Sequence, residues 1–250
     1  MNDIFDRGLR LFDGIIYESI NRYPTFIHIK SIFSDEWYNF IVPIVQSGRM
    51  DWTHAEIIIN LEKINGYSLS YYVPESLLSD YVEYFASNDH NKNLGSDVFS
   101  CKQVLEKYTP LGELTLVDDE TITTYIRMAK TCFPDWANNE EYAIHMYDHQ
   151  KNNKQLVVQN YLLKHNDTFV GFCGMICSQK DNLAYFHNTG VLPEFRRKGY
   201  FNAIIQHLIN TVISLKISDT YALVENESGS YYGLSKLGFT VEDKYHLFSI

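Results

Sequence analysis

The alternation of apolar and polar residues is most regular from about residue 112 onward. The stretch "VDDETITTYIRMAKTCFP" places apolar side chains at positions 122, 125, 126 and 129, after acidic residues and before Pro134, so it predicts a helix. A second helix is expected in "NNEEYAIHMYDHQ". Apolar runs then predict three strands, in "QLVVQNYLLK", "FVGFCGMICS" and "NLAYFHNTGV", with a hairpin turn at "HNDT".

The remaining pattern completes a sheet flanked by helices. From Phe201, apolar residues at 201, 204, 205, 208, 212 and 215 have the spacing of one helical face. A short strand in "TYALVE", a helix ending at a glycine in "GSYYGLSKLGF" and a last strand in "VEDKYHLFSI" follow. The predicted order is ααβββαβαβ, so the fold class is α/β with a mixed sheet (α+β).

The first 110 residues give a weaker pattern. We expect helices in "DIFDRGLRLFDGIIYESI" and "PESLLSDYVEYFASND", the second with proline in its first turn, and strands in "TFIHIKSIF", "AEIIINL" and "YSLSYYV". The breakers in "KYTPLGE" predict a boundary, which gives a smaller α/β domain at residues 1–110 and a second domain at 111–250. The first region carries no recognisable catalytic constellation.

Composition and charge narrow the function. The chain has 250 residues, 45% of them hydrophobic, and a formal net charge of -10, which predicts a folded protein without general affinity for nucleic acid or anionic membranes. An amine substrate suits this charge. The charged start and the lack of a long uncharged apolar run predict a cytoplasmic protein. The four cysteines, which form no CxxC pair, are expected to be buried free thiols: Cys101, Cys132, Cys173 and Cys177.

Three consecutive cations stand at the start of the helix that begins near residue 200. Arg196, Arg197 and Lys198 are followed by Gly199, which would let a ligand approach the backbone closely. Unpaired amides at a helix N-terminus form an anion site, and with the cations this site would suit a pyrophosphate. The alternative is a solvated basic turn before an ordinary helix.

The stretch "VLPEFRRKG" at residues 191–199, between a strand and an amphipathic helix, resembles motif A of the GNAT acyltransferases. The later "LSKLGF", at residues 234–239, is similar to the end of a helix in the same family. The resemblance covers about residues 112–250 and implies the family's fold and acyl-CoA binding. In the first half, "YYVPESLLSDYVEYF" and "NLGSDVF" echo the family's last helix and strands, which suggests a degenerate second copy; a cap domain and an extension of one domain are the alternatives.

The resemblance also assigns roles to residues. Gly190 and Val191 would pair with the pantetheine arm of acetyl-CoA, the co-substrate, and an N–H such as that of Val191 would stabilise the oxyanion formed when an amine attacks the thioester. The pyrophosphate would lie against the backbone around Arg196, Arg197, Lys198, Gly199, Tyr200, Phe201 and Asn202. Asn226 is a further candidate for pantetheine or substrate binding.

Two positions depart from the family pattern. Phe201 stands where the family usually has glycine or alanine, and Leu234 aligns with the tyrosine that commonly protonates the CoA thiolate. Tyr231, three residues earlier, is a candidate substitute, with simple packing of Tyr231 and Tyr232 as the alternative. For the base that accepts the ammonium proton, the candidates are Glu225 and His187, each of which could instead be an ordinary surface or hydrogen-bonded residue.

The leading hypothesis is an N-acetyltransferase that transfers acetyl from acetyl-CoA to the primary amine of a small molecule in a ternary complex. The alternative is a non-catalytic CoA-binding or sensor module, suggested by Leu234 and Phe201. His145 and His149 are four residues apart but lack a third ligand, so no metal is expected. Nucleic acid and membrane are not expected as partners, and "FPDW" with Trp136 is expected in a loop near the acceptor pocket.

Overall fold

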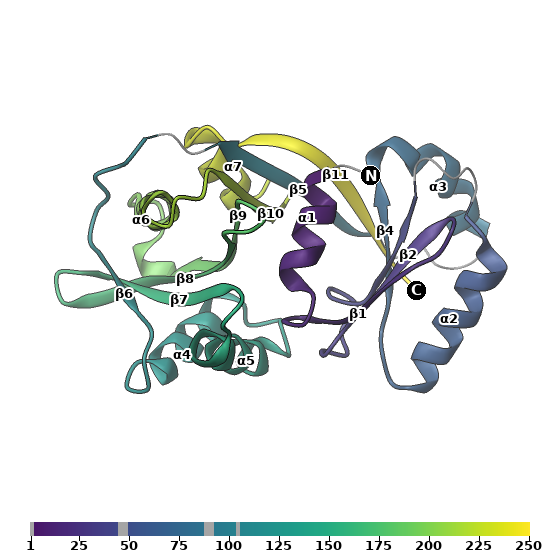
Figure 1. Cartoon of the computed structure of the whole chain (residues 1–250), viewed down its shortest axis with the longest axis horizontal. Helices are drawn as coiled ribbons and strands as arrows, with labels where there is room; N and C mark the ends of the chain where they lie inside the picture. Colours follow the sequence, from purple (N-terminus) through teal and green to yellow (C-terminus); the bar gives the residue numbers. More distant parts are fainter. Residues whose placement is uncertain (1–2, 45–49, 88–92, 104–105) are drawn as a thin grey trace. The chain divides into compact units, whose positions relative to one another are not determined.

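The computed structural model describes residues 3–44, 50–87, 93–103 and 106–250. The chain divides into two compact units, one of residues 1–99 with 241–250 and the other of residues 100–240. We describe each unit by itself, and Figure 1 identifies the elements by label and colour. No helix in the described part of the chain is both long and apolar enough to cross a membrane.

The second unit contains the predicted helices and strands between residues 122 and 239. Its strand order is β10-β9-β8-β7-β6, with β9 and β10 parallel and the other pairs antiparallel. The elements are β6 (Glu113–Leu116), α4 (Ile122–Cys132), α5 (Asn139–Asn152), β7 (Val157–His165), β8 (Thr168–Ser178), β9 (Leu183–Val191), the 3-10 turn η3 (Pro193–Phe195), α6 (Tyr200–Ser214), β10 (Asp219–Glu225) and α7 (Gly229–Lys236). The mixed α/β fold is confirmed, whereas the short strand β6 was not predicted.

Helices cover both faces of this sheet (Figure 1). Helices α6 and α7 pack on one face, where side chains such as Leu208 and Leu234 meet alternate residues of β7, β8 and β9. Helices α4 and α5 pack on the opposite face around Tyr125 and Phe172. Period-two alternation therefore places each strand residue in one of two cores.

The cysteine prediction is confirmed at two positions. Cys173 and Cys177 are buried free thiols on the same face of β8. Cys132 is a free thiol but only half-buried, so it departs from the prediction. The side chain of Cys101 lies outside the described residues.

The first unit also contains parallel and antiparallel strands, in the order β1-β2-β3-β4-β11-β5. Its elements are α1 (Asp3–Phe12), β1 (Tyr17–Arg22), β2 (Phe26–Ser31), β3 (Phe40–Pro43), α2 (Trp52–Ile64), β4 (Ser70–Pro74), the 3-10 turn η2 (Glu75–Leu77), α3 (Leu78–Ser87), β5 (Asn93–Gln103) and β11 (Thr240–Ser249). Helix α1, strands β1 to β3, crossover α2, the parallel strand β4 and α3 repeat the order of α5, β7 to β9, α6, β10 and α7. This repetition supports the interpretation of the first half as a degenerate copy.

Three expectations for this unit need correction. The stretch "AEIIINL" is helix α2 and not a strand, because Ala55, Ile58 and Ile59 form a buried helical face. The first predicted helix ends at Phe12, and its last residues belong to strand β1. Pro74 is the last residue of β4 and not part of the following helix.

The C-terminal strand β11 also differs from its expected place. It pairs antiparallel with β4, from Tyr245↔Pro74 to Ser249↔Ser70, and the ring of Phe248 stacks on Phe85 at 4.5 Å. Residues 241–250 therefore belong to the compact unit of residues 1–99, whereas the sequence placed them with residues 111–240. The apolar pattern of a strand indicates that it is buried but not which strand it pairs with.

Candidate active site

Strands β9 and β10 part before they end. Their parallel pairing runs from Asp219↔Leu183 to Ala222↔Phe186, but β9 continues for five residues to Val191 and β10 for three residues to Glu225. A pocket occupies the space between these continuing ends. The separation thus opens the interior of the sheet to a ligand.

A β-bulge in β9 shapes the same end of the sheet. Phe172 pairs with Gly190, yet Gly174 pairs with His187, so β9 carries one more residue than β8 in this interval. The extra length falls at residues 188 and 189, where Asn188 has a positive φ of 46°. Because the Leu192 N–H donates to Val170 O at 3.1 Å, strand alternation directs the Val191 N–H away from β8.

The first of two pockets lies at the N-terminus of α6, and we call it the helix-end pocket. Its volume is about 610 Å³, and the N-cap of α6 is Gly199, which has no side chain to cap the first-turn amides. Of the ten predicted cofactor-binding residues, eight line it: Gly190, Val191, Arg196, Arg197, Gly199, Tyr200, Phe201 and Asn202. Lys198 and Asn226 are not among its lining residues.

The three cations have different roles in the local structure. Arg196 Nε donates to Val191 O at 3.1 Å, and Lys198 Nζ donates to Glu194 O at 3.0 Å. Both side chains therefore stabilise the turn between β9 and α6. Arg197, at φ 62°, is exposed, and its guanidinium has no partner within the described residues. Among the three cations, Arg197 is the one most available to an anion.

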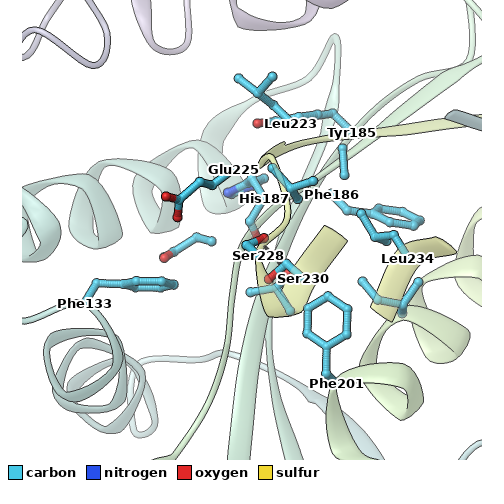
Figure 2. Close-up of a pocket in the computed structure, with 15 residues that line it drawn as sticks. Phe133, Tyr185, Phe186, His187, Phe201, Leu223, Glu225, Ser228, Ser230 and Leu234 are labelled. Carbon is cyan, nitrogen blue, oxygen red and sulfur yellow. Dashed lines mark hydrogen bonds between the residues drawn. The ribbon is translucent and has the colours of Figure 1, made fainter. Parts of the chain in front are cut away.

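The second pocket, which we call the strand-end pocket, has a volume of about 280 Å³ and lies between the parted ends of β9 and β10 (Figure 2). It shares four lining residues with the helix-end pocket, namely Phe133, Thr189, Phe201 and Ser230. Two of the three predicted catalytic residues, His187 and Glu225, line it. The two pockets therefore meet around the same strand ends.

His187 is held rigidly in the strand-end pocket. Its side chain is 6% exposed, its Nδ1 lies 2.9 Å from Tyr142 Oη, and its Nε2 is buried without a hydrogen-bond partner within the described residues. Burial lowers the pKa of His187 to about 3, so the imidazole is neutral near pH 7. It can hydrogen-bond a substrate but is a poor acceptor for a full proton.

Gly174 makes the position of His187 possible. A Cβ on Gly174 would lie 2.2 Å from the His187 Cε1 atom and 2.5 Å from Nε2, far inside van der Waals contact. Gly190 has a similar packing role, because a Cβ there would meet the ring of Phe172 at 2.5 Å. Both positions therefore require glycine, because a larger residue would clash with the neighbouring ring.

Asn188 and Glu225 supply further acceptors. The Asn188 amide nitrogen donates to Tyr125 Oη at 3.0 Å, which leaves the buried Oδ1 without a partner within the described residues. Glu225 is exposed at the end of β10, and its carboxylate extends over the pocket near Phe133 in Figure 2. Both oxygen groups can accept hydrogen bonds from an amine.

The other predicted residues lie elsewhere. Tyr231 is half-buried on α7 with its ring 5.2 Å from that of Tyr232, and it is not among the lining residues of either pocket. Leu234 lines the strand-end pocket and is 1% exposed. Trp136 lies in the loop between α4 and α5, as predicted, with its ring 5.0 Å from Tyr142.

Phe201 occupies the junction of the two pockets. It projects from α6 toward Ser230 in Figure 2, and a Cβ on Gly233 would lie 2.6 Å from its ring. Gly233 therefore leaves room for the aromatic side chain between α6 and α7. The bulky residue fits by packing on helix α7.

Several lining residues were not predicted. The helix-end pocket adds Cys132, Gly229, Gly233 and Lys236, and the strand-end pocket adds Tyr185, Ser228 and Ser230. The period-two alternation in "AYFHN" placed Tyr185 on the face of His187 and could have identified it. No group of three His, Cys, Asp or Glu in the described part of the chain could hold a metal ion.

Comparisons with known proteins concern the family and the fold. Residues 122–239 match the model of the Acetyltransferase (GNAT) family, whereas no curated protein matches the chain. Among solved structures, the chain is similar to a GCN5-related N-acetyltransferase from Kribbella flavida, at 12% identity and a TM-score of 0.68 over 98% of this chain and 94% of that chain. A GCN5-related N-acetyltransferase from Sphaerobacter thermophilus gives 11% identity and 0.67 over 98% and 84%.

A tandem GNAT protein from the clavulanic acid biosynthesis pathway is also similar, at 13% identity and a TM-score of 0.61 over 90% of this chain and 78% of that chain. At these identities the likeness concerns the fold, and it includes the first unit. The motif, the parted strands and the family match all fall within the second unit. Residues 122–239 therefore form an acetyltransferase domain of the GNAT family.

Proposed function

We propose that this protein transfers acetyl from acetyl-CoA to the primary amine of a small molecule, by direct attack in a ternary complex. The observation that carries the proposal is the meeting of two chemically different pockets at the parted ends of β9 and β10. One pocket has cations and helix amides suited to phosphates, and the other has a carboxylate and a neutral histidine suited to an amine. A cytoplasmic location stays a prediction.

The helix-end pocket fits the phosphates of acetyl-CoA. Arg197 and Lys236 line it, and the uncapped amides at the start of α6 supply donors. The exposed backbone of Gly190 and Val191 on β9 would pair with the pantetheine arm as an added strand does. When bound, acetyl-CoA supplies an activated acyl group.

The residues around the strand ends account for the transfer. The amine nitrogen forms a bond to the thioester carbonyl carbon, and the Val191 N–H, which faces away from β8, stabilises the negative charge on oxygen. The carbon–sulfur bond then breaks, which releases the amide and the CoA thiolate. Glu225 accepts the proton from the ammonium group, directly or through water, because the neutral His187 holds a proton weakly.

The thiolate needs less assistance than an alkoxide would, because thiols have a pKa near 8.5. Leu234 cannot donate a proton, and Tyr231 does not line either pocket. Ser230 lines both pockets and could transmit a proton from water to the sulfur. We therefore expect the transfer to depend on Glu225 and not on a tyrosine.

Phe201 and Leu234 favour a second function. Phe201 puts a large ring between the pockets, and Leu234 is aliphatic where the family commonly has a proton-donating tyrosine. A non-catalytic CoA-binding or sensor module would have these features. It predicts CoA binding without release of thiol in the presence of any amine.

Calorimetric titration with acetyl-CoA, CoA and free pantetheine tests the proposal, followed by a thiol-release assay with an amine panel. We expect both cofactors to bind much more tightly than pantetheine. Arg197→Gln should weaken CoA binding about tenfold or more through loss of a charge-assisted hydrogen bond. Arg127→Gln, at an exposed position on α4 outside both pockets, is the matched control.

Binding of the cofactors without turnover would support the sensor module and exclude the acetyltransferase. If neither cofactor bound, both functions would be refuted. Equal loss of affinity in the Arg127 and Arg197 variants would show that net charge, and not the helix-end pocket, holds the cofactor.

A further inference from the structure

The strand-end pocket combines one negative charge with apolar walls. We propose that its ligand, the acyl acceptor, is a primary monoamine with a flat apolar body, preferably an aromatic ring. The inference rests on the proposed function, because it assigns the acceptor to this pocket. It goes further by specifying the number of charges and the shape of that acceptor.

The charge of the pocket selects for a single ammonium group. Among the described residues that line it, Glu225 is the only one with an ionised side chain, and His187 is neutral. A polyamine would bring further ammonium groups next to apolar walls, and each unpaired charge would lose hydration without compensation. A monoamine satisfies Glu225 and leaves no charge unpaired.

Hydrogen-bond acceptors in the pocket match a primary amine. In the tautomer whose Nδ1–H donates to Tyr142 Oη, His187 has an acceptor at the unpartnered Nε2, and Asn188 has an unpartnered Oδ1. The Glu225 carboxylate adds a third acceptor on the same pocket. A primary ammonium carries three N–H groups and can use more of these acceptors than a tertiary ammonium, which carries one.

Aromatic and aliphatic side chains form most of the wall. The rings of Tyr185 and His187 are nearly parallel, 5.9 Å apart at 14°, and Tyr221 continues the series 4.6 Å from Tyr185. The apolar lining consists of Phe133, Tyr185, Phe186, Phe201, Ile205, Ala222, Leu223, Val224 and Leu234. Planar rings along a wall favour a ligand that is also planar, through stacked or edge contacts.

The volume sets an upper limit on the acceptor. At about 280 Å³, the pocket is slightly below the usual range of roughly 300–1,000 Å³ for drug-sized ligands. One ring with a short aminoalkyl chain suits this space, while an oligosaccharide amine or a folded protein surface does not. Size and charge therefore indicate the same class of acceptor.

Direct binding measurements on the full chain test the inference without relying on turnover. We would titrate 2-phenylethylamine, 2-phenylethanol and spermidine calorimetrically, with and without saturating CoA. We expect 2-phenylethylamine to bind at least tenfold more tightly than the other two. Glu225→Gln should weaken amine binding about tenfold and leave the alcohol unchanged, whereas Glu227→Gln, an exposed acid outside the pocket, should change neither.

The inference is wrong if spermidine binds as tightly as 2-phenylethylamine, if the alcohol equals the amine, or if none of the three binds in either state. These results are separable from a failure of the proposed function. If the protein acetylated only polyamines, the proposed acceptor would be wrong, but the proposed acetyltransferase function would stand. If 2-phenylethylamine and CoA both bound tightly but no acetyl was transferred, the proposed ligand of the strand-end pocket would stand and the proposed acetyltransferase function would be wrong.

Discussion

Substitution of Gly174 by alanine tests whether the His187 ring is held in place as the structure shows. The new Cβ would lie 2.2 Å, 2.5 Å and 2.7 Å from three ring atoms of His187, so the ring or strand β8 must shift by more than an ångström to restore ordinary contact. The ring is restrained by the 2.9 Å contact with Tyr142 Oη and by the neighbouring ring of Tyr185. The strain therefore cannot be relieved by a simple rotation.

Two terms set the expected loss of stability. Overpacking in a well-packed interior costs about 1–3 kcal/mol, and loss of the buried Tyr142–His187 hydrogen bond costs about 1 kcal/mol more. We expect Gly174→Ala to lower the free energy of unfolding by about 2–4 kcal/mol, measured by urea denaturation with circular dichroism. Gly229→Ala is the matched control, since a Cβ there meets no atom within 4 Å, and it should stay within about 0.5 kcal/mol of the parent.

A double substitution separates this clash from a general effect in β8. In Gly174→Ala with His187→Ala, the Cβ no longer meets a ring, so the two losses should be less than additive by at least about 1 kcal/mol. Additive losses, or a Gly174→Ala variant as stable as the parent, would refute the reasoning. They would mean that His187 does not occupy the position given by its contacts.

Three further predictions concern His187, Phe201 and the cysteines. Because folding holds the pKa of His187 near 3 and unfolding restores it to about 6.5, stability should fall as pH drops below 6.5, by up to about 1.4 kcal/mol per pH unit. A His187→Gln variant should show a shallower pH dependence of its unfolding free energy, and an identical one would contradict this. Phe201→Ala should open the junction of the pockets and raise the rate with hexanoyl-CoA relative to acetyl-CoA at least tenfold; an unchanged ratio would show that the ring does not limit the acyl group. Alkylation followed by peptide mapping should modify the half-buried Cys132 before Cys177 and be slowed at Cys132 by CoA, while Cys177, whose pKa is raised by burial to about 12, should react only on unfolding.

The sequence predicted the elements of the second unit because its apolar spacing is consistent over whole helices and strands. It failed at α2, where the buried residues Ala55, Ile58 and Ile59 alternate with the exposed Ile57, Leu61 and Ile64. These extra apolar residues hide the helical period and resemble a β-branched strand. Strand β6 was missed because its four residues, two exposed and two half-buried, carry little pattern.

The site was predictable only where one segment holds the relevant atoms. The turn from Val191 to Gly199 was identified because its cations and glycine are consecutive. The contact between Tyr142 and His187 joins residues 45 positions apart, and the separation of β9 from β10 depends on where two strands stop pairing. Neither feature leaves a local signal, so the buried acceptors of the strand-end pocket required the structure.

The membership of β11 in the first unit has a consequence for how the protein is made. During synthesis, residues 1–99 leave the ribosome well before residues 241–250, yet the sheet of the first unit contains β11 between β4 and β5. The nascent first unit therefore exposes the edge of β4 while the second unit is translated, and an unpaired edge is a template for aggregation. Expression of residues 1–110 alone would make that exposure permanent, so a soluble fragment needs the last ten residues supplied through a linker or as a separate peptide.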